Sequence, residues 1–149
     1  MKKDLKLYNA LFPLWFIVYI FPQTWLIAIP GNFIIDSVVL LIAMFALKIE
    51  DKGKFYKSKI FLLFICGFSA DFIGALLMLI VLYLGVGSMG DELYITIPGL
   101  IISAVLIYVL DYTLVLKNCD KHIRKVLSLV FAIATAPYTF LIPSSLIYG

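Results

Sequence analysis

The sequence is poor in charged residues, and this scarcity sets the class of protein. Only 14% of its 149 residues are charged and 64% are hydrophobic, whereas soluble domains average about 25% charged and about 45–50% apolar. A chain this short cannot cover a water-facing surface with so few polar groups. The composition therefore excludes a soluble globular protein and predicts one domain whose outer surface is covered by lipid.

Reactive side chains are also scarce, which excludes most enzyme classes. His122 is the single histidine and lies in a basic loop with Cys119 and Asp120, so a Ser–His–Asp hydrolase is excluded and a metal site there is disfavoured. Cys66 lies in an apolar run away from Cys119, and we expect two free thiols. "SMGD" is only a superficial match to intramembrane aspartic proteases. We predict no enzyme, no cofactor and no metal.

The sequence contains long apolar runs. A helix needs about 20 residues to cross a bilayer, and several of these runs are long enough. The basic start lacks a signal-peptide cleavage site, so the first run is expected to be retained. Pro22 is expected to kink or break it, and "IPGN" at 29–32 predicts a tight hairpin to the second run. An alternative makes 22–32 a re-entrant loop. We predict an all-α integral membrane protein, a bundle of five transmembrane helices at 8–29, 33–49, 59–86, 93–116 and 126–148.

The placement of the basic residues predicts the orientation. All twelve Lys and Arg residues fall within 2–6, 48–59 and 117–125. Five crossings from a cytoplasmic N-terminus put all three segments on the cytoplasmic side, as the positive-inside rule requires. The net charge of +3 is then explained by anchoring near anionic lipid. We predict a multi-pass protein of the cell membrane that does not bind nucleic acid.

Three carboxyl groups interrupt the apolar runs without any Lys, Arg or His beside them in a span. Asp36 is expected in the outer third of the membrane, Asp71 near the midplane and Asp111 in the inner third. Each costs at least about 2.5–3.5 kcal/mol at the bilayer centre, so we interpret them as candidates for a proton or cation relay. Tyr108, three residues before Asp111, is expected to reach it with a hydrogen bond.

Ordinary structural explanations exist for two of these carboxyl groups. Asp36 follows "PGN" closely enough to cap the start of a helix. Asp111 is near enough to Lys117 to extend towards the membrane surface. Asp71 has neither explanation, which makes it the strongest functional candidate.

Small and hydroxyl residues line one face of several predicted helices. Gly67 and Gly74 share a stripe with Asp71, and glycines at such spacing let another helix approach closely. Stripes of this kind usually serve helix packing, and here they would line either a packing seam or a cavity. The further members of this set are Asn32, Ser128, Thr135 and Thr139.

Three stretches carry a resemblance to a known group. "FPQTWLIAIPGNFIIDS", "GFSADFIGA" and "TAPYTFLIPSSL" resemble uncharacterised small polytopic membrane proteins of Gram-positive bacteria, over most of the chain. The resemblance implies no activity.

Two functions fit these observations. The first is a small proton- or cation-coupled transporter or permeation protein that uses the intramembrane carboxyl groups. The second is a non-transporting membrane subunit, in a homo-oligomer or with a membrane partner, whose carboxyl groups are neutral and form hydrogen bonds between helices. Convergence of the three aspartates would favour the first.

Overall fold

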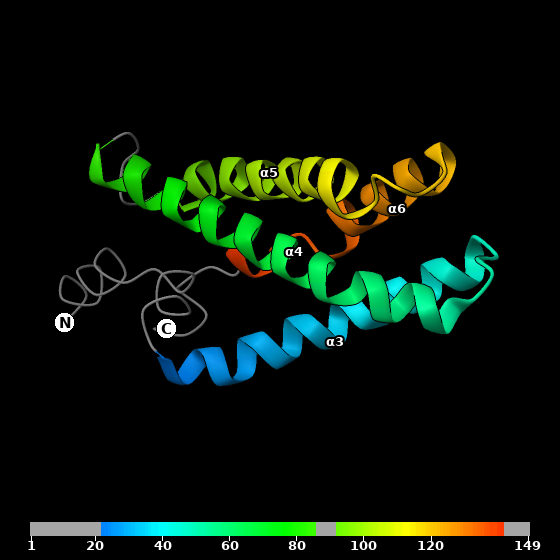
Figure 1. Ribbon diagram of the computed structural model, residues 1–149. Helices are drawn as coiled ribbons and strands as arrows, with labels where there is room; N and C mark the ends of the chain where they lie inside the picture. Colours follow the sequence, from blue (N-terminus) through cyan, green and yellow to red (C-terminus); the bar gives the residue numbers. More distant parts are fainter. Residues whose placement is uncertain (1–21, 86–91, 142–149) are drawn as a thin grey trace.

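The fold contains only helices in the part of the chain that the structure, a computed structural model, describes: residues 22–85 and 92–141. Figure 1 shows α4 running obliquely between α3 and α5, with the shorter α6 beside the end of α5. The predicted all-α class is confirmed. The elements are α3 (Pro22–Ala46), α4 (Lys52–Tyr83), α5 (Glu92–Leu110), the π-helix η1 (Asp111–Val115), α6 (Lys121–Ala134) and the 3-10 helix η2 (Tyr138–Leu141).

Three of the described helical segments are long and apolar enough to cross a membrane: Pro22–Ala46, Lys52–Tyr83 and Tyr94–Val115. Their outer faces carry exposed apolar side chains, such as Ile27 and Phe45, which is the pattern expected of surfaces that face lipid. These helices support the predicted insertion into a membrane.

The predicted hairpin between the first two runs is wrong, as is the re-entrant loop over 22–32. Helix α3 continues through "IPGN", with Pro30 inside it. Proline removes one backbone hydrogen bond, but ending a helix in an apolar medium leaves several backbone groups unpaired, each at a cost of several kcal/mol. One missing bond therefore costs less than a turn at this depth. The rest of the first predicted span, 8–21, lies outside the described residues.

The fifth predicted span, 126–148, is not one continuous helix. Helix α6 ends at Ala134, and the chain bends before η2 begins at Tyr138. The cause is Pro137, whose ring clashes with the carbonyl four residues earlier, that of Ile133. The Tyr138 hydroxyl donates a hydrogen bond to this Ile133 carbonyl, so the break leaves it paired. Residues 142–149 lie outside the described part of the chain.

The third and fourth predicted spans are close to what the structure shows. Helix α4 begins at Lys52, two turns earlier than the predicted start at 59, and ends at Tyr83. Helix α5 and η1 together run from Glu92 to Val115, against a predicted 93–116. The earlier start of α4 places its lysines on the helix itself rather than in a loop.

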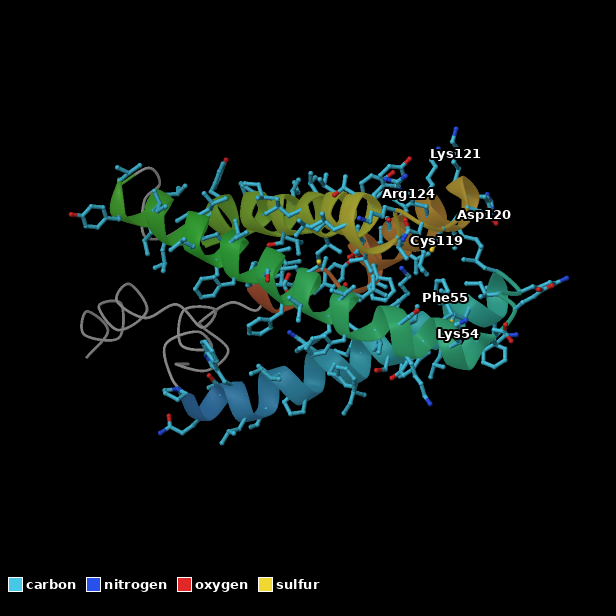
Figure 2. The ribbon with its side chains drawn as sticks, in the orientation of Figure 1. Lys54, Phe55, Cys119, Asp120, Lys121 and Arg124 are labelled. Carbon is cyan, nitrogen blue, oxygen red and sulfur yellow. The ribbon has the colours of Figure 1, made fainter. Side chains whose placement is uncertain are left out.

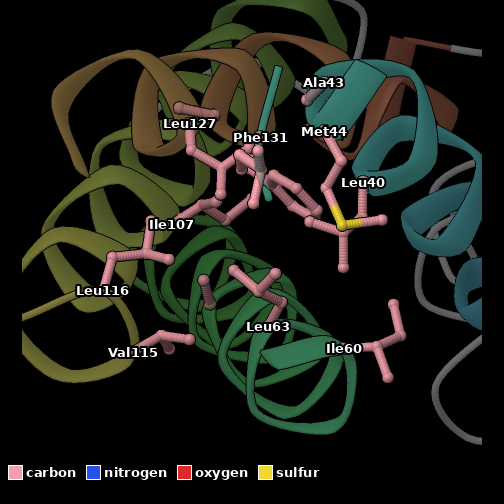
Figure 3. Close-up of a cluster of buried hydrophobic side chains, with 13 residues drawn as sticks. Leu40, Ala43, Met44, Ile60, Leu63, Ile107, Val115, Leu116, Leu127 and Phe131 are labelled. Atoms are coloured by element: carbon pink, nitrogen blue, oxygen red, sulfur yellow. The ribbon is translucent and has the colours of Figure 1, made fainter. Parts of the chain in front are cut away.

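The main hydrophobic core joins all the long elements near the end where α3 meets α4 and α5 meets α6. Figure 3 shows Leu40 and Met44 from α3 and Leu63 from α4 around Phe131 of α6. A smaller cluster at the other end of α4 contains Met78, Ile95 and Phe140. The bundle is therefore held together most extensively at its basic end.

Candidate functional site

The three intramembrane aspartates come from three different elements and all point inward. Asp36 lies in the middle of α3, Asp71 in α4, and Asp111 is the first residue of η1. Their exposed fractions are 5%, 7% and 0%. The inward orientation expected of carboxyl groups in a membrane is thus observed for all three.

Asp36 of α3 faces α4 one turn from Asp71. Its Oδ2 lies 3.9 Å from where a Cβ on Gly67 would be, and Gly67 precedes Asp71 by one turn. We call Asp36, Asp71 and Asp111 the carboxyl cluster. Their expected order of depth in the membrane stays a prediction.

Two of the structural explanations weighed for these residues are wrong. Asp36 does not cap a helix, because α3 continues for more than three turns on its N-terminal side. Asp111 does not reach the surface towards Lys117, since its side chain has no exposed area while Lys117 is exposed. Asp36 lies within α3, and Asp111 continues the buried face of α5 one turn after Ile107, so both side chains are directed into the bundle.

Several oxygens of the carboxyl cluster have no hydrogen-bond partner within the described residues. They are Oδ1 of Asp71 and both carboxyl oxygens of Asp111. Leaving a buried polar group unpaired costs about 1–3 kcal/mol. The predicted bond from Tyr108 to Asp111 is therefore absent, and the Tyr108 ring instead stacks on Tyr112, with ring centroids 5.8 Å apart.

The glycines flanking Asp71 pack against the chain's own helices. A Cβ on Gly74 would lie 1.9 Å from Oγ of Ser103 in α5, and the Ser103 hydroxyl donates a hydrogen bond of 3.3 Å to the Ala70 carbonyl. Gly67 lies against Asp36 of α3. The predicted contact face of this helix is observed, and it sets the spacing of α3 and α5 around Asp71.

The remaining predicted residues occupy separate places. Asn32 is half-buried, one turn before Asp36 in α3. Ser128 of α6 is fully buried with an unpaired Oγ, while the Thr135 hydroxyl donates to the Phe131 carbonyl at 2.9 Å. The side chain of Thr139 lies outside what the structure describes. Of this set, Gly67 is the member shown in contact with the carboxyl cluster.

The sequence reading missed η1 and the two cations that contact it. Lys59 of α4 donates from Nζ to the Val115 carbonyl at 2.7 Å, and Arg124 of α6 donates from Nε to the Tyr112 carbonyl at 2.5 Å. The Arg124 guanidinium also lies over the Tyr112 ring, 3.9 Å from its centroid. Nothing in the sequence distinguishes these two cations from the other basic residues, which all look like surface anchors.

The geometry restricts what the carboxyl cluster can bind. Within the described residues, no group of three or more His, Cys, Asp or Glu side chains is close enough to hold a metal ion. The three carboxyl groups of the cluster therefore do not form one coordination shell. Buried carboxyl groups in such an arrangement can each take up and release a proton.

No family model, curated protein or solved structure matches this chain. The resemblance to small polytopic proteins of Gram-positive bacteria thus stays a prediction. A function has to be argued from the carboxyl cluster itself.

Proposed function

We propose that the chain is a cell-membrane protein that passes protons through its carboxyl cluster, alone or coupled to a small solute or cation. In the proposed topology the N-terminus is cytoplasmic. This topology keeps five spans, the last of which is the proline-broken segment that begins with α6. In support, the basic segments around Lys54 and around Lys121 and Arg124 lie at one end of the bundle (Figure 2), as a common cytoplasmic side requires.

One observation carries the proposal: three carboxyl groups from three helices are buried in the bundle, and Asp71 and Asp111 have oxygens without hydrogen-bond partners in the described part of the chain. An ionised carboxylate is disfavoured by removal from water, so a carboxyl group in this setting favours its neutral form and binds a proton. Intramembrane acidic residues with this placement are typical of proton pathways.

A proton fits the carboxyl cluster better than a bare metal cation does. A cation stripped of water needs several oxygens around it at once, about six or more for calcium, and the described residues do not provide three such side chains together. Protons need only one carboxyl group at a time. Asp36, which faces α4 one turn from Asp71, would then exchange protons with it.

The alternative of a non-transporting subunit has less support. Carboxyl groups that hold helices together are expected to be hydrogen-bonded, and both oxygens of Asp111 are unpaired among residues 22–85 and 92–141. The glycine face expected to receive a partner helix is already occupied by α3 and α5. A partner or a second copy would have to bind elsewhere, on the exposed apolar faces.

A flux measurement in proteoliposomes tests the proposal. With a pH gradient imposed and an internal pH dye, the unaltered protein is expected to dissipate the gradient, and Asp71→Asn is expected to abolish this flux because an amide cannot bind a proton at this depth. Asp51→Asn, which alters an exposed carboxyl group just before α4, should conduct like the unaltered protein.

Two results would count against the proposal in different ways. If Asp71→Asn conducts normally, Asp71 is not part of the pathway. If the unaltered protein shows no flux with any gradient and instead co-purifies in fixed proportion with a membrane partner, the subunit alternative is the better description.

A further inference from the structure

Two carbonyl groups of η1 have no hydrogen-bond donor from their own helix. The Leu116 N–H donates to the Asp111 carbonyl, five residues back, at 2.9 Å. In an α-helix that same N–H would go to the Tyr112 carbonyl. Val115 is the last residue of η1, and the Cys119 N–H donates to the Leu116 carbonyl at 2.9 Å, so the Val115 carbonyl has no donor from its own helix.

Both of these carbonyls receive a cation from a neighbouring helix instead. The Tyr112 carbonyl accepts from Arg124 of α6, and the Val115 carbonyl accepts from Lys59 of α4. Hydrogen bonds from charged donors are roughly twice as strong as neutral ones. The stacking of Arg124 on the Tyr112 ring adds a second attachment at the same point.

Arg124 therefore takes the place of an α-helical donor. If η1 became α-helical, the Leu116 N–H would take the Tyr112 carbonyl from Arg124. Lys59 instead pairs a carbonyl at the end of η1, where a helix leaves its carbonyls without donors. Asp111 lies one turn after Ile107 on the buried face of α5 and one turn before Val115, so the two attachments hold the backbone next to its side chain.

From these contacts we propose that Lys59 and Arg124 are positioning residues for Asp111: by attaching η1 to α4 and α6, they keep this carboxyl group enclosed in the bundle and away from water. The importance of Asp111 as a relay point rests on the proposed function, but the positioning itself does not. Single π-turns occur frequently at functional sites, and here the two cations that hold the turn are on separate helices. A movement of α4 or α6 would therefore change how closely the bundle encloses Asp111.

The test measures how far water reaches each carboxyl group, without using flux. The full-length protein in phosphatidylcholine liposomes is treated with a water-soluble carbodiimide and excess glycine methyl ester, and amide formation at Asp111 and Asp71 is followed by peptide mass spectrometry. The variants are Lys59→Met and Arg124→Met, with Lys57→Met and Lys125→Met as controls that remove an exposed positive charge from the same two helices.

We expect roughly a tenfold faster modification of Asp111 in Lys59→Met and in Arg124→Met, the factor that corresponds to losing one hydrogen bond from a charged donor. Asp71 should keep its rate, and both control variants should behave as the unaltered protein. Lys59→Arg keeps a donor for the Val115 carbonyl and should restore the slow rate at Asp111.

Three results would overturn the proposal: an unchanged rate at Asp111, an equal rise at Asp71 and Asp111, which means general loosening of the bundle, or an equal rise in the control variants. The proposed function fails separately. If the unaltered protein carries no flux but the labelling follows the expected pattern, the positioning role stands and the proton pathway does not.

Discussion

Replacing Gly74 with alanine tests how closely α4 and α5 pack beside Asp71. The added Cβ would lie 1.9 Å from Oγ of Ser103, 3.2 Å from the Gly99 carbonyl oxygen and 3.3 Å from Cβ of Ser103. The first contact can be relieved only if the Ser103 side chain turns away, which breaks its hydrogen bond to the Ala70 carbonyl. The other two contacts require the helices to move apart by a few tenths of an ångström.

The expected loss of stability follows from these contacts. Losing one hydrogen bond costs about 1 kcal/mol, and forcing an extra methyl group into a packed interface costs about 1–3 kcal/mol. The replacement of glycine by alanine also stabilises the helix itself by about 0.5–1 kcal/mol, because alanine is the better helix former. We therefore expect Gly74→Ala to lower the free energy of unfolding by about 2 kcal/mol.

Gly67 offers a matched control on the same face of the same helix. A Cβ there would meet only Oδ2 of Asp36, at 3.9 Å, which is an ordinary contact distance. Gly67→Ala should therefore keep or raise the stability, by up to about 1 kcal/mol. In Gly74→Ala combined with Ser103→Ala, the closest clash is gone, and the two changes should be non-additive as expected of contacting residues.

The free energy of unfolding can be measured by titrating mixed micelles with a denaturing detergent and following helix content by circular dichroism. The reasoning is refuted if Gly74→Ala is as stable as Gly67→Ala, or if the Ser103→Ala background does not reduce its cost. Either result would mean that α4 and α5 lie farther apart than described.

Two further substitutions test single contacts. Tyr56→Phe removes the 2.9 Å hydrogen bond from the Tyr56 hydroxyl to Oγ of Ser37, which joins α4 to α3, and should lower the free energy of unfolding by about 0.5–1.5 kcal/mol in the same titration. The control Tyr83→Phe, at a highly exposed position, should leave it unchanged. Equal effects of the two substitutions would contradict the role of this bond. Ser128→Ala removes a buried hydroxyl without a partner, so the stability should stay the same or rise by about 1–3 kcal/mol, whereas a loss would reveal a partner for Ser128.

The helical class and the inward direction of the aspartates could be predicted because they follow from solvation. An apolar medium forces backbone groups to pair within a helix and drives an unpaired carboxyl group away from lipid. Both effects depend on composition and position, which the sequence displays directly. The sequence therefore indicates Asp36, Asp71 and Asp111 as a set.

The ends of the helices were harder to predict because each proline acts through its surroundings. Pro30 lies inside α3, while Pro137 follows the end of α6, although both interrupt apolar runs. The difference depends on local partners, such as the Tyr138 hydroxyl that takes up the Ile133 carbonyl. Propensity alone ranks both positions as breaks, and the turn predicted at "IPGN" failed for this reason.

The contacts of η1 could not be predicted from the sequence for another reason. The backbone of one turn decides which carbonyls lack a helical donor. The positions of α4 and α6 beside that turn decide which cations bind these carbonyls. Lys59 and Arg124 therefore cannot be told from Lys57 and Lys125 by spacing or composition. Tyr108 was likewise assigned to Asp111 from helical spacing, whereas its ring stacks on Tyr112.

The length of α4 links the protein to the thickness of its membrane. Its 32 residues extend about 48 Å at the helical rise, well beyond the roughly 30 Å of hydrocarbon in a bilayer. With the lysine-bearing turns left in the headgroup region, the apolar remainder is still about 36 Å long, so α4 must tilt. A thinner bilayer requires a larger tilt. Because Lys59 of α4 is bonded to the Val115 carbonyl of η1, the length of the lipid chains would then affect how closely α4 and η1 enclose Asp111.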